Sequence, residues 1–101
     1  MTDKQKRRCH LIAEHYGERH QLLKAIEEMA ELTQALIKYI YDPSEWDQVC
    51  DELADVTIMA EQMNYLVSKW VEPRMHGVMN DVEFRIETKL LRQMRRMEAD
   101  S

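Results

Sequence analysis

The chain of 101 residues carries 14 lysines and arginines against 19 aspartates and glutamates, a formal net charge of −5, with only 2 glycines and 2 prolines. This length accommodates one small domain over residues 1–101 and leaves too few residues for a second hydrophobic core. Glycine and proline punctuate turns, so their scarcity favours long helices over a many-stranded sheet and predicts an all-α fold. The acidic balance argues against nucleic acid as the main partner, because nucleic-acid binders need a dominant basic surface.

The amino-terminal residues indicate no secretory signal. Residues 1–8 are charged, and no apolar segment of the kind found in signal peptides follows them. The longest strongly apolar run, residues 56–60, is far shorter than the ~20 residues of a membrane-spanning helix. Cys9 and Cys50 lack the spacing of a redox or metal motif, which is typical of reduced thiols. We therefore expect a cytoplasmic protein with no membrane partner.

Two helices are predicted in the first half of the chain. The first covers residues 3–16 and stops at Gly17, a residue type common just after a helix. The second runs over residues 18–41 and ends before Pro43, because the residue that precedes a proline is pushed out of the α conformation.

Two further helices are predicted in the second half. Ser44, with an acidic residue three positions later, resembles a capping box and predicts a third helix that reaches about Trp70. A loop over residues 71–79 follows. Asn80 then caps a fourth helix, which continues to about Glu98 and ends in basic residues that the helix dipole favours.

Helical periodicity predicts the core faces of the two central helices. The arc on the second helix contains Leu22, Leu23, Ile26, Met29, Ala30, Thr33, Leu36, Ile37 and Ile40. The arc on the third contains Trp46, Val49, Cys50, Leu53, Val56, Ala60 and Val67. Such wide apolar arcs exceed what a chain of this size can cover alone, so we expect a homodimer or a dimer of dimers.

Four acidic residues form two pairs at helical spacing. Glu28 and Glu31 share one face of the second helix, and Glu52 and Asp55 share one face of the third, where apolar residues surround them. A carboxylate removed from water needs a proton, a cation or a metal ion. If the two pairs face each other, they offer four oxygen donors, which suit Mg²⁺ and also Mn²⁺, whereas zinc prefers His and Cys ligands.

The spacing of these acids also fits a structural alternative. Acidic pairs three residues apart arise by chance in a chain so rich in acids, and Lys24 lies at the spacing of an ordinary surface ion pair with Glu28. Periodicity alone therefore leaves open a metal site and a solvated acidic face.

The acidic motif resembles that of a known family. The run Glu27-Glu28-Met-Ala-Glu31, followed twenty residues later by Glu52-Leu-Ala-Asp55, resembles the signature of the MazG-like all-α nucleoside triphosphate pyrophosphohydrolases, and the resemblance covers about residues 18–98. It implies a four-helix bundle assembled as a homo-oligomer. It also implies Mg²⁺-dependent cleavage of a (deoxy)nucleoside triphosphate into the monophosphate and pyrophosphate.

The same resemblance implies roles for individual residues. The metal ligands would be Glu28, Glu31, Glu52 and Asp55, and the catalytic residues Glu27 and Glu28, with Glu27 supporting the metal site or orienting water. The phosphate-binding residues would be Lys24, Lys89, Arg92 and Arg96, of which the last three share a face of the fourth helix. A basic turn that complements the helix dipole is the alternative for these three. Glu87 departs from the family, whose members often carry an asparagine at that position.

Two other functions remain open on the sequence. One is a non-catalytic helical interaction protein, in which the acidic faces only keep the protein in solution. The other is a more specialised relative that shares the acidic motif, such as a dUTP or dCTP pyrophosphatase or a phosphoribosyl-ATP pyrophosphohydrolase.

Overall fold

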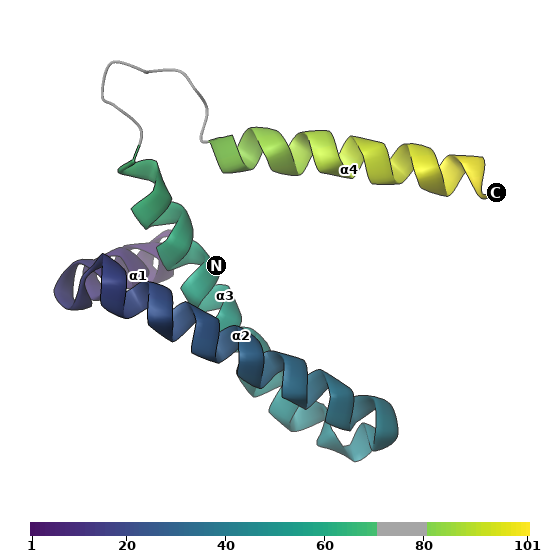
Figure 1. Ribbon diagram of the computed structural model, residues 1–101, viewed down its shortest axis with the longest axis horizontal. Coiled ribbons are helices and arrows are strands. Elements are labelled where there is room, and N and C mark those ends of the chain that lie inside the picture. The colour runs from purple at the N-terminus through teal and green to yellow at the C-terminus, as the bar shows by residue number, and fades with distance from the viewer. Residues whose placement is uncertain (71–80) are drawn as a thin grey trace. The chain divides into compact units, whose positions relative to one another are not determined.

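The computed structural model describes residues 1–70 and 81–101, and every regular element in these two ranges is a helix (Figure 1). The all-α prediction is therefore confirmed. The chain divides into two compact units, Met1–Val67 and Ser68–Ser101. Helices α1 to α3 belong to the first unit and α4 to the second, while the four-helix bundle stays a prediction. The expected loop over residues 71–79 and the expected cap Asn80 lie outside the described residues.

Helix α1 (Asp3–Tyr16) is capped at both ends by the residues that flank it. The hydroxyl of Thr2 accepts a hydrogen bond from the backbone N–H of Gln5, at 3.1 Å, and the Gln5 side chain accepts one from the N–H of Thr2, at 2.8 Å. This reciprocal capping box satisfies two backbone donors that a helix start leaves unpaired. Gly17 ends the helix at φ +87°, a conformation that favours glycine, and α2 begins at the next residue.

Helices α2 (Glu18–Tyr41) and α3 (Trp46–Ser68) run antiparallel and are joined by the short 3₁₀ helix η1 (Pro43–Glu45), as Figure 1 shows. The expected cap of the third helix at Ser44 is wrong, because Ser44 lies inside η1 and Asp42 caps η1, which leads into α3. The Asp42 carboxylate accepts hydrogen bonds from the Ser44 backbone N–H, at 3.1 Å, and hydroxyl, at 2.7 Å. These two bonds lower the pKa of Asp42. Asp42 is extended, as the residue before a proline prefers, so the helical turn begins at Pro43 rather than after Ser44.

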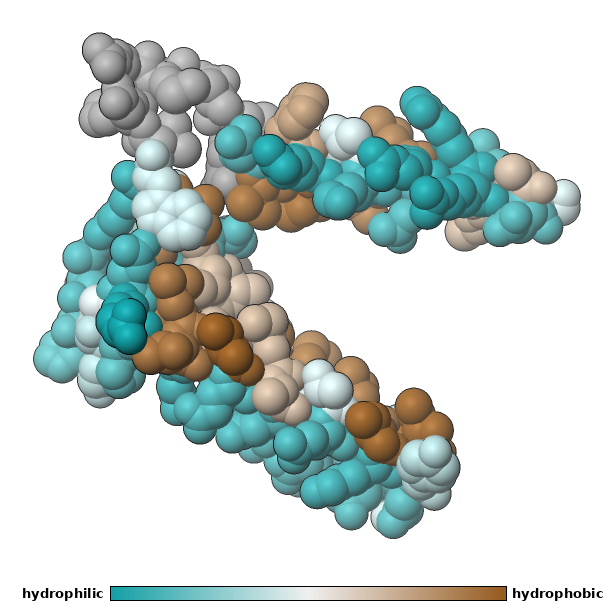
Figure 2. Space-filling model, in the orientation of Figure 1, coloured by the Kyte–Doolittle hydropathy of each residue, from teal (hydrophilic) through white to brown (hydrophobic). Residues whose placement is uncertain are grey.

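The buried faces of α2 and α3 are not the apolar arcs that periodicity predicts. The residues that α2 buries are Gln21, Ala25, Glu28 and Ala35, and those that α3 buries are Glu52, Met59, Gln62 and Leu66. Ile26, at the centre of the α2 arc, is 61% exposed, and Leu53 and Trp46 on α3 are also exposed. The prediction of the core faces is therefore wrong for the single chain. Apolar surface, brown in Figure 2, is left uncovered on both units.

Helix α1 buries two of its residues and is joined to α3 by a hydrogen bond and a ring stack. Cys9 and Ala13 are buried, and burial raises the pKa of the Cys9 thiol. The Tyr65 hydroxyl donates a hydrogen bond to Glu14 at 2.6 Å, and the His10 ring stacks on the Tyr65 ring with centroids 4.2 Å apart. These contacts place the end of α1 beside the two long helices that carry the acidic residues.

Helix α4 (Asp81–Ala99) buries none of its residues. Its exposed apolar side chains include Phe84, Leu90, Leu91, Met94 and Met97. A helix with one apolar side is stable when another surface covers that side. Among the described helices, none is long and apolar enough to cross a membrane.

Candidate metal centre

The antiparallel arrangement of α2 and α3 brings the predicted acidic residues together. One carboxylate oxygen each from Glu28, Glu31 and Glu52 lies within 4.8 Å of the other two. Asp55 joins a second group with Asp51 and Glu52 that meets the same distance. All four predicted ligands thus belong to two groups that share Glu52. Sequence reasoning missed Asp51, although its position four residues before Asp55 and next to Glu52 was a usable signal.

Glu28 and Glu52 are buried carboxylates, only 7% and 8% exposed. One oxygen of each has a partner: Lys24 Nζ lies 3.3 Å from Glu28 Oε1, and Gln48 Nε2 donates to Glu52 Oε1 at 2.6 Å. The Oε2 atom of each is buried without a hydrogen-bond partner among residues 1–70 and 81–101. A buried polar atom left unpaired costs ~1–3 kcal/mol, and more when it is charged. A fully solvated acidic face therefore does not describe these two residues.

The charges of the cluster repel one another. The pKa of Glu31 is raised above its ordinary value, mainly by the charge of Glu28, then by partial desolvation and by the charge of Glu52. The pKa of Lys24 is also raised, chiefly by its hydrogen bond to Glu28. Lys24 is the one ammonium paired with the cluster in the described part of the chain, so the negative charge exceeds the positive.

The donor set fits a hard divalent cation. Both groups contain only carboxylate oxygens, and two of these oxygens are buried and unpartnered. Mg²⁺ and Mn²⁺ prefer such ligands, whereas zinc sites are built mainly from His and Cys. The residues that could hold the ion are Glu28, Glu31 and Glu52, with Asp55 and Asp51 on its α3 side.

As the pH falls, Mg²⁺ binding at this cluster is expected to weaken at a higher pH than it would at glutamates with an ordinary pKa. The cation binds the deprotonated carboxylate, and the raised pKa of Glu31 lets a proton compete at a higher pH. Calorimetric Mg²⁺ titrations from pH 8 down to pH 5 measure this, and the Glu31→Gln protein should bind more weakly with a flatter pH profile. Equal pH profiles for both proteins would exclude Glu31 as the titrating ligand.

In the metal-free protein, the raised pKa of Glu31 has the opposite effect, because a lower pH stabilises the fold. The folded state binds the Glu31 proton more tightly than the unfolded state, so stability increases as the pH falls through the raised pKa towards the ordinary pKa of the unfolded state. Thermal unfolding in EDTA over the same pH range measures this contribution.

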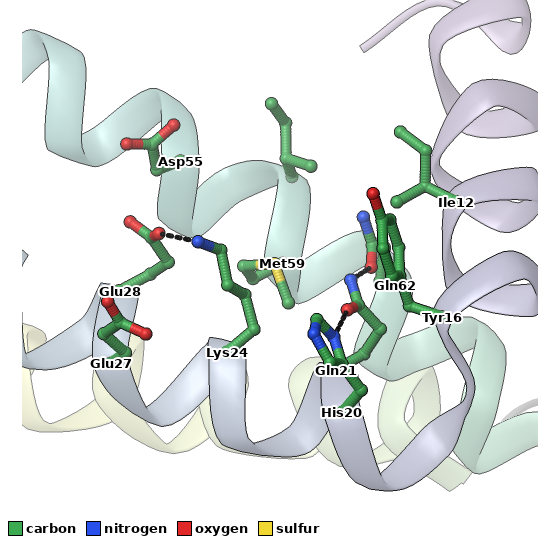
Figure 3. A pocket seen from close by; sticks show the side chains of 11 residues that line it. Ile12, Tyr16, His20, Gln21, Lys24, Glu27, Glu28, Asp55, Met59 and Gln62 are labelled. Atoms are coloured by element: carbon green, nitrogen blue, oxygen red, sulfur yellow. Dashed lines mark hydrogen bonds and ion pairs between the residues drawn. The ribbon is translucent and has the colours of Figure 1, made fainter.

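An open pocket of about 550 Å³ adjoins the acidic cluster (Figure 3). Glu27, Glu28, Asp55 and Lys24 lie at one end of it, and Tyr16, His20, Gln21 and Gln62 lie at the other, as the close-up shows. Ile12, Ile58 and Met59 complete its lining. The pocket therefore joins an acidic end to an end with aromatic and amide groups.

A hydrogen-bonded chain of side chains forms the second end of the pocket. Gln21 Nε2 donates to Gln62 Oε1 at 2.6 Å, and His20 Nδ1 lies 2.6 Å from Gln21 Oε1. The ring of Tyr16 stacks on that of His20, with centroids 4.9 Å apart. Sequence reasoning missed both glutamines. Their signal was spacing, since Gln21 lies seven residues before Glu28, and Gln62 seven after Asp55.

The basic residues expected to bind phosphate lie on α4. Lys89, Arg92 and Arg96 are exposed and share one face of this helix, and Arg85, missed in the sequence, falls on the same face four residues before Lys89. The phosphate-binding role of these residues stays a prediction.

Comparison of the chain with models of known protein families, with curated proteins and with solved structures found no match. The resemblance to MazG-like enzymes therefore rests on the acidic motif.

Proposed function

We propose that this protein is a Mg²⁺-dependent, MazG-like hydrolase that cleaves a (deoxy)nucleoside triphosphate into the monophosphate and pyrophosphate. The observation that supports it most is the pair of buried carboxylates, Glu28 and Glu52, each with an unpartnered oxygen, beside an open pocket. A merely structural cluster would be expected to pair these oxygens internally. On this proposal the enzyme works in the cytoplasm as a homo-oligomer.

The acidic residues divide into two roles in this proposal. Glu28, Glu31, Glu52 and Asp55 hold the cation, which when bound would neutralise charge that develops on phosphate oxygens. Glu27 is exposed, lines the pocket and belongs to neither acidic group. Its carboxylate would therefore be available to orient the attacking water and accept its proton. Water attacks the α-phosphorus, the bond between this phosphorus and the bridging oxygen breaks, and pyrophosphate leaves.

Lys24 links the acidic cluster to the phosphates of the substrate. Its ammonium group pairs with Glu28 Oε1 at 3.3 Å, and this contact keeps it protonated by raising its pKa. Once a divalent cation compensates Glu28, Lys24 can turn to triphosphate oxygens in the same pocket. We assign Lys89, Arg92 and Arg96 to phosphate binding as well, with Arg85 on their face of α4.

One observation favours the non-catalytic alternative. The exposed apolar side chains of α2 and α4 would suit a helical interaction protein. The same side chains also suit the homo-oligomer of the enzyme, whereas the unpartnered oxygens of Glu28 and Glu52 have no role in a simple scaffold. The hydrolase is therefore the better supported function. Specialised relatives that act on dUTP, dCTP or phosphoribosyl-ATP share the acidic motif and differ only in substrate.

Pyrophosphate release from a panel of nucleoside and deoxynucleoside triphosphates tests the proposal. We expect release with Mg²⁺ and its loss in EDTA, because the acidic cluster alone only repels a triphosphate. Phosphoribosyl-ATP belongs in the panel, so that a specialised relative is identified. Absence of metal-dependent release from every substrate would favour the interaction protein.

A further inference from the structure

We propose that the end of the pocket formed by Tyr16, Gln21 and Gln62 recognises the carbonyl group of a nucleobase, with Gln62 as the residue that determines specificity. The inference rests on the proposed function, since the substrate there is a nucleotide whose phosphates lie at the acidic end. It adds the class of base that the pocket selects.

The hydrogen-bonded chain of side chains leaves the Gln62 Nε2 group at its end. Gln21 and Gln62 are almost fully buried, at 3% and 1% exposure. Oε1 of Gln21 can only accept, so Nδ1 of His20 carries the proton of their 2.6 Å contact. Nε2 of Gln21 then donates to Oε1 of Gln62. The side-chain hydrogen bonds therefore end at the Gln62 Nε2 group.

The Nε2 group of Gln62 has N–H donors that are not used in these hydrogen bonds. Within residues 1–70 and 81–101, no hydrogen bond is formed by Gln62 Nε2, and the side chain lines the pocket. A nearly buried N–H group without a partner favours a ligand that supplies an acceptor. The amide nitrogen can only donate, so the ligand has to supply an acceptor, which we assign to the exocyclic carbonyl oxygen of a base because it projects from the ring towards the donor.

The walls around this donor suit a flat heterocycle. Tyr16 presents an exposed ring that His20 supports by stacking, and Tyr16 and Gln62 both line this end of the pocket (Figure 3). Ile58 and Met59 add apolar surface to the lining. Aromatic side chains stack on every nucleobase, whichever groups its edge carries. Tyr16 would therefore supply general affinity, and Gln62 the selection between bases.

The Gln62 Nε2 group separates the bases by their exocyclic carbonyl groups. Uracil, thymine, cytosine and guanine carry an exocyclic carbonyl oxygen, whereas adenine has only ring nitrogens as acceptors. A site built to hydrogen-bond a group discriminates against an analogue that lacks it, because the buried donor is left unpaired. The pocket is thus expected to disfavour adenine.

Binding of nucleosides to the metal-free protein tests this inference separately from the hydrolase. Titrations with uridine, guanosine and adenosine, followed by the NMR signals of the glutamine side-chain amides, should shift the Gln62 signal. The Gln62→Met protein should bind uridine and guanosine about five- to tenfold more weakly and adenosine less than twofold more weakly. Gln34→Met, the same change at an exposed position of α2, should bind all three as the unchanged protein does.

A second variant keeps the test independent of the buried position. Tyr16 is exposed, so the Tyr16→Leu protein should fold normally. It should bind all three nucleosides more weakly, by a similar factor. The inference is overturned if no nucleoside shifts the NMR signal of the Gln62 amide. It is also overturned if Gln62→Met weakens the binding of adenosine as much as that of guanosine. Because neither metal nor triphosphate is present, these outcomes do not depend on whether pyrophosphate is released in the panel above.

Discussion

Replacing Glu52 by glutamine is expected to abolish the response to Mg²⁺ and to lower triphosphate turnover by about 100-fold or more. Glu52 belongs to both acidic groups, so no other single change removes a donor from each. The amide keeps an oxygen for the Gln48 hydrogen bond and places an N–H₂ group where Glu52 has its unpartnered oxygen. The new donor can then bond a neighbouring carboxylate such as Glu28.

The metal-free Glu52→Gln protein should be more stable than the unchanged protein. Removing one of several like charges within about 5 Å relieves repulsion worth roughly 1–2 kcal/mol at a partly buried site. Thermal and urea unfolding in EDTA and in Mg²⁺ measure both effects. We expect a higher midpoint in EDTA and no further increase with Mg²⁺.

Glu45→Gln provides the matched control, since Glu45 is exposed in η1 and lies outside the acidic groups. This variant should respond to Mg²⁺ and turn over substrate as the unchanged protein does. A Glu52→Gln protein that keeps its Mg²⁺ response would rule out the metal centre. One that is destabilised by several kcal/mol would instead make Glu52 a structural partner in a buried ion pair.

Replacing Ile26 by arginine is expected to convert a self-associated protein into a monomer. Ile26 lies at the centre of the apolar arc of α2 and is 61% exposed in the single chain. In a symmetric dimer the substitution enters the interface twice, and each buried, unpaired arginine would cost several kcal/mol. Light scattering behind size-exclusion chromatography should show a mass near 12.1 kDa for the variant and a multiple of it for the unchanged protein.

Leu11→Arg is the control for this experiment, because it places the same charge on an exposed leucine that belongs to α1 rather than to the α2 arc. It should keep the oligomer. If the unchanged protein is itself a monomer at tens of micromolar, the apolar arcs do not mediate self-association. The interaction protein would then gain support, with a different chain covering the arcs.

The helix ends were predictable wherever one residue decides them locally. Gly17 ends α1 because few other residues adopt its positive φ, and Pro43 ends α2 because it constrains Asp42. The cap at Ser44 was misplaced by two residues. Asp42 and Ser44 both carry capping oxygens, and only the extended backbone of Asp42 decides which of them accepts the hydrogen bonds.

The candidate site was only partly predictable. Glu28, Glu31, Glu52 and Asp55 carry a periodic signal, and the structure places all of them in the two acidic groups. The glutamine pair could not be predicted in the same way. Gln21 and Gln62 are 41 residues apart, and the local sequence around either one does not indicate that the other lies within hydrogen-bond distance.

The sequence by itself determined that this protein is helical, where α1 and α2 end, and which acids lie on one face, because these follow from local backbone preferences and a 3.6-residue repeat. Only the tertiary structure decided which face each helix turns inwards. Periodicity identifies an apolar side but does not state whether the same chain covers it. In the single chain α2 and α3 bury Glu28 and Glu52 rather than Ile26 and Leu53, so their inner surface carries the candidate site and their apolar surface remains exposed.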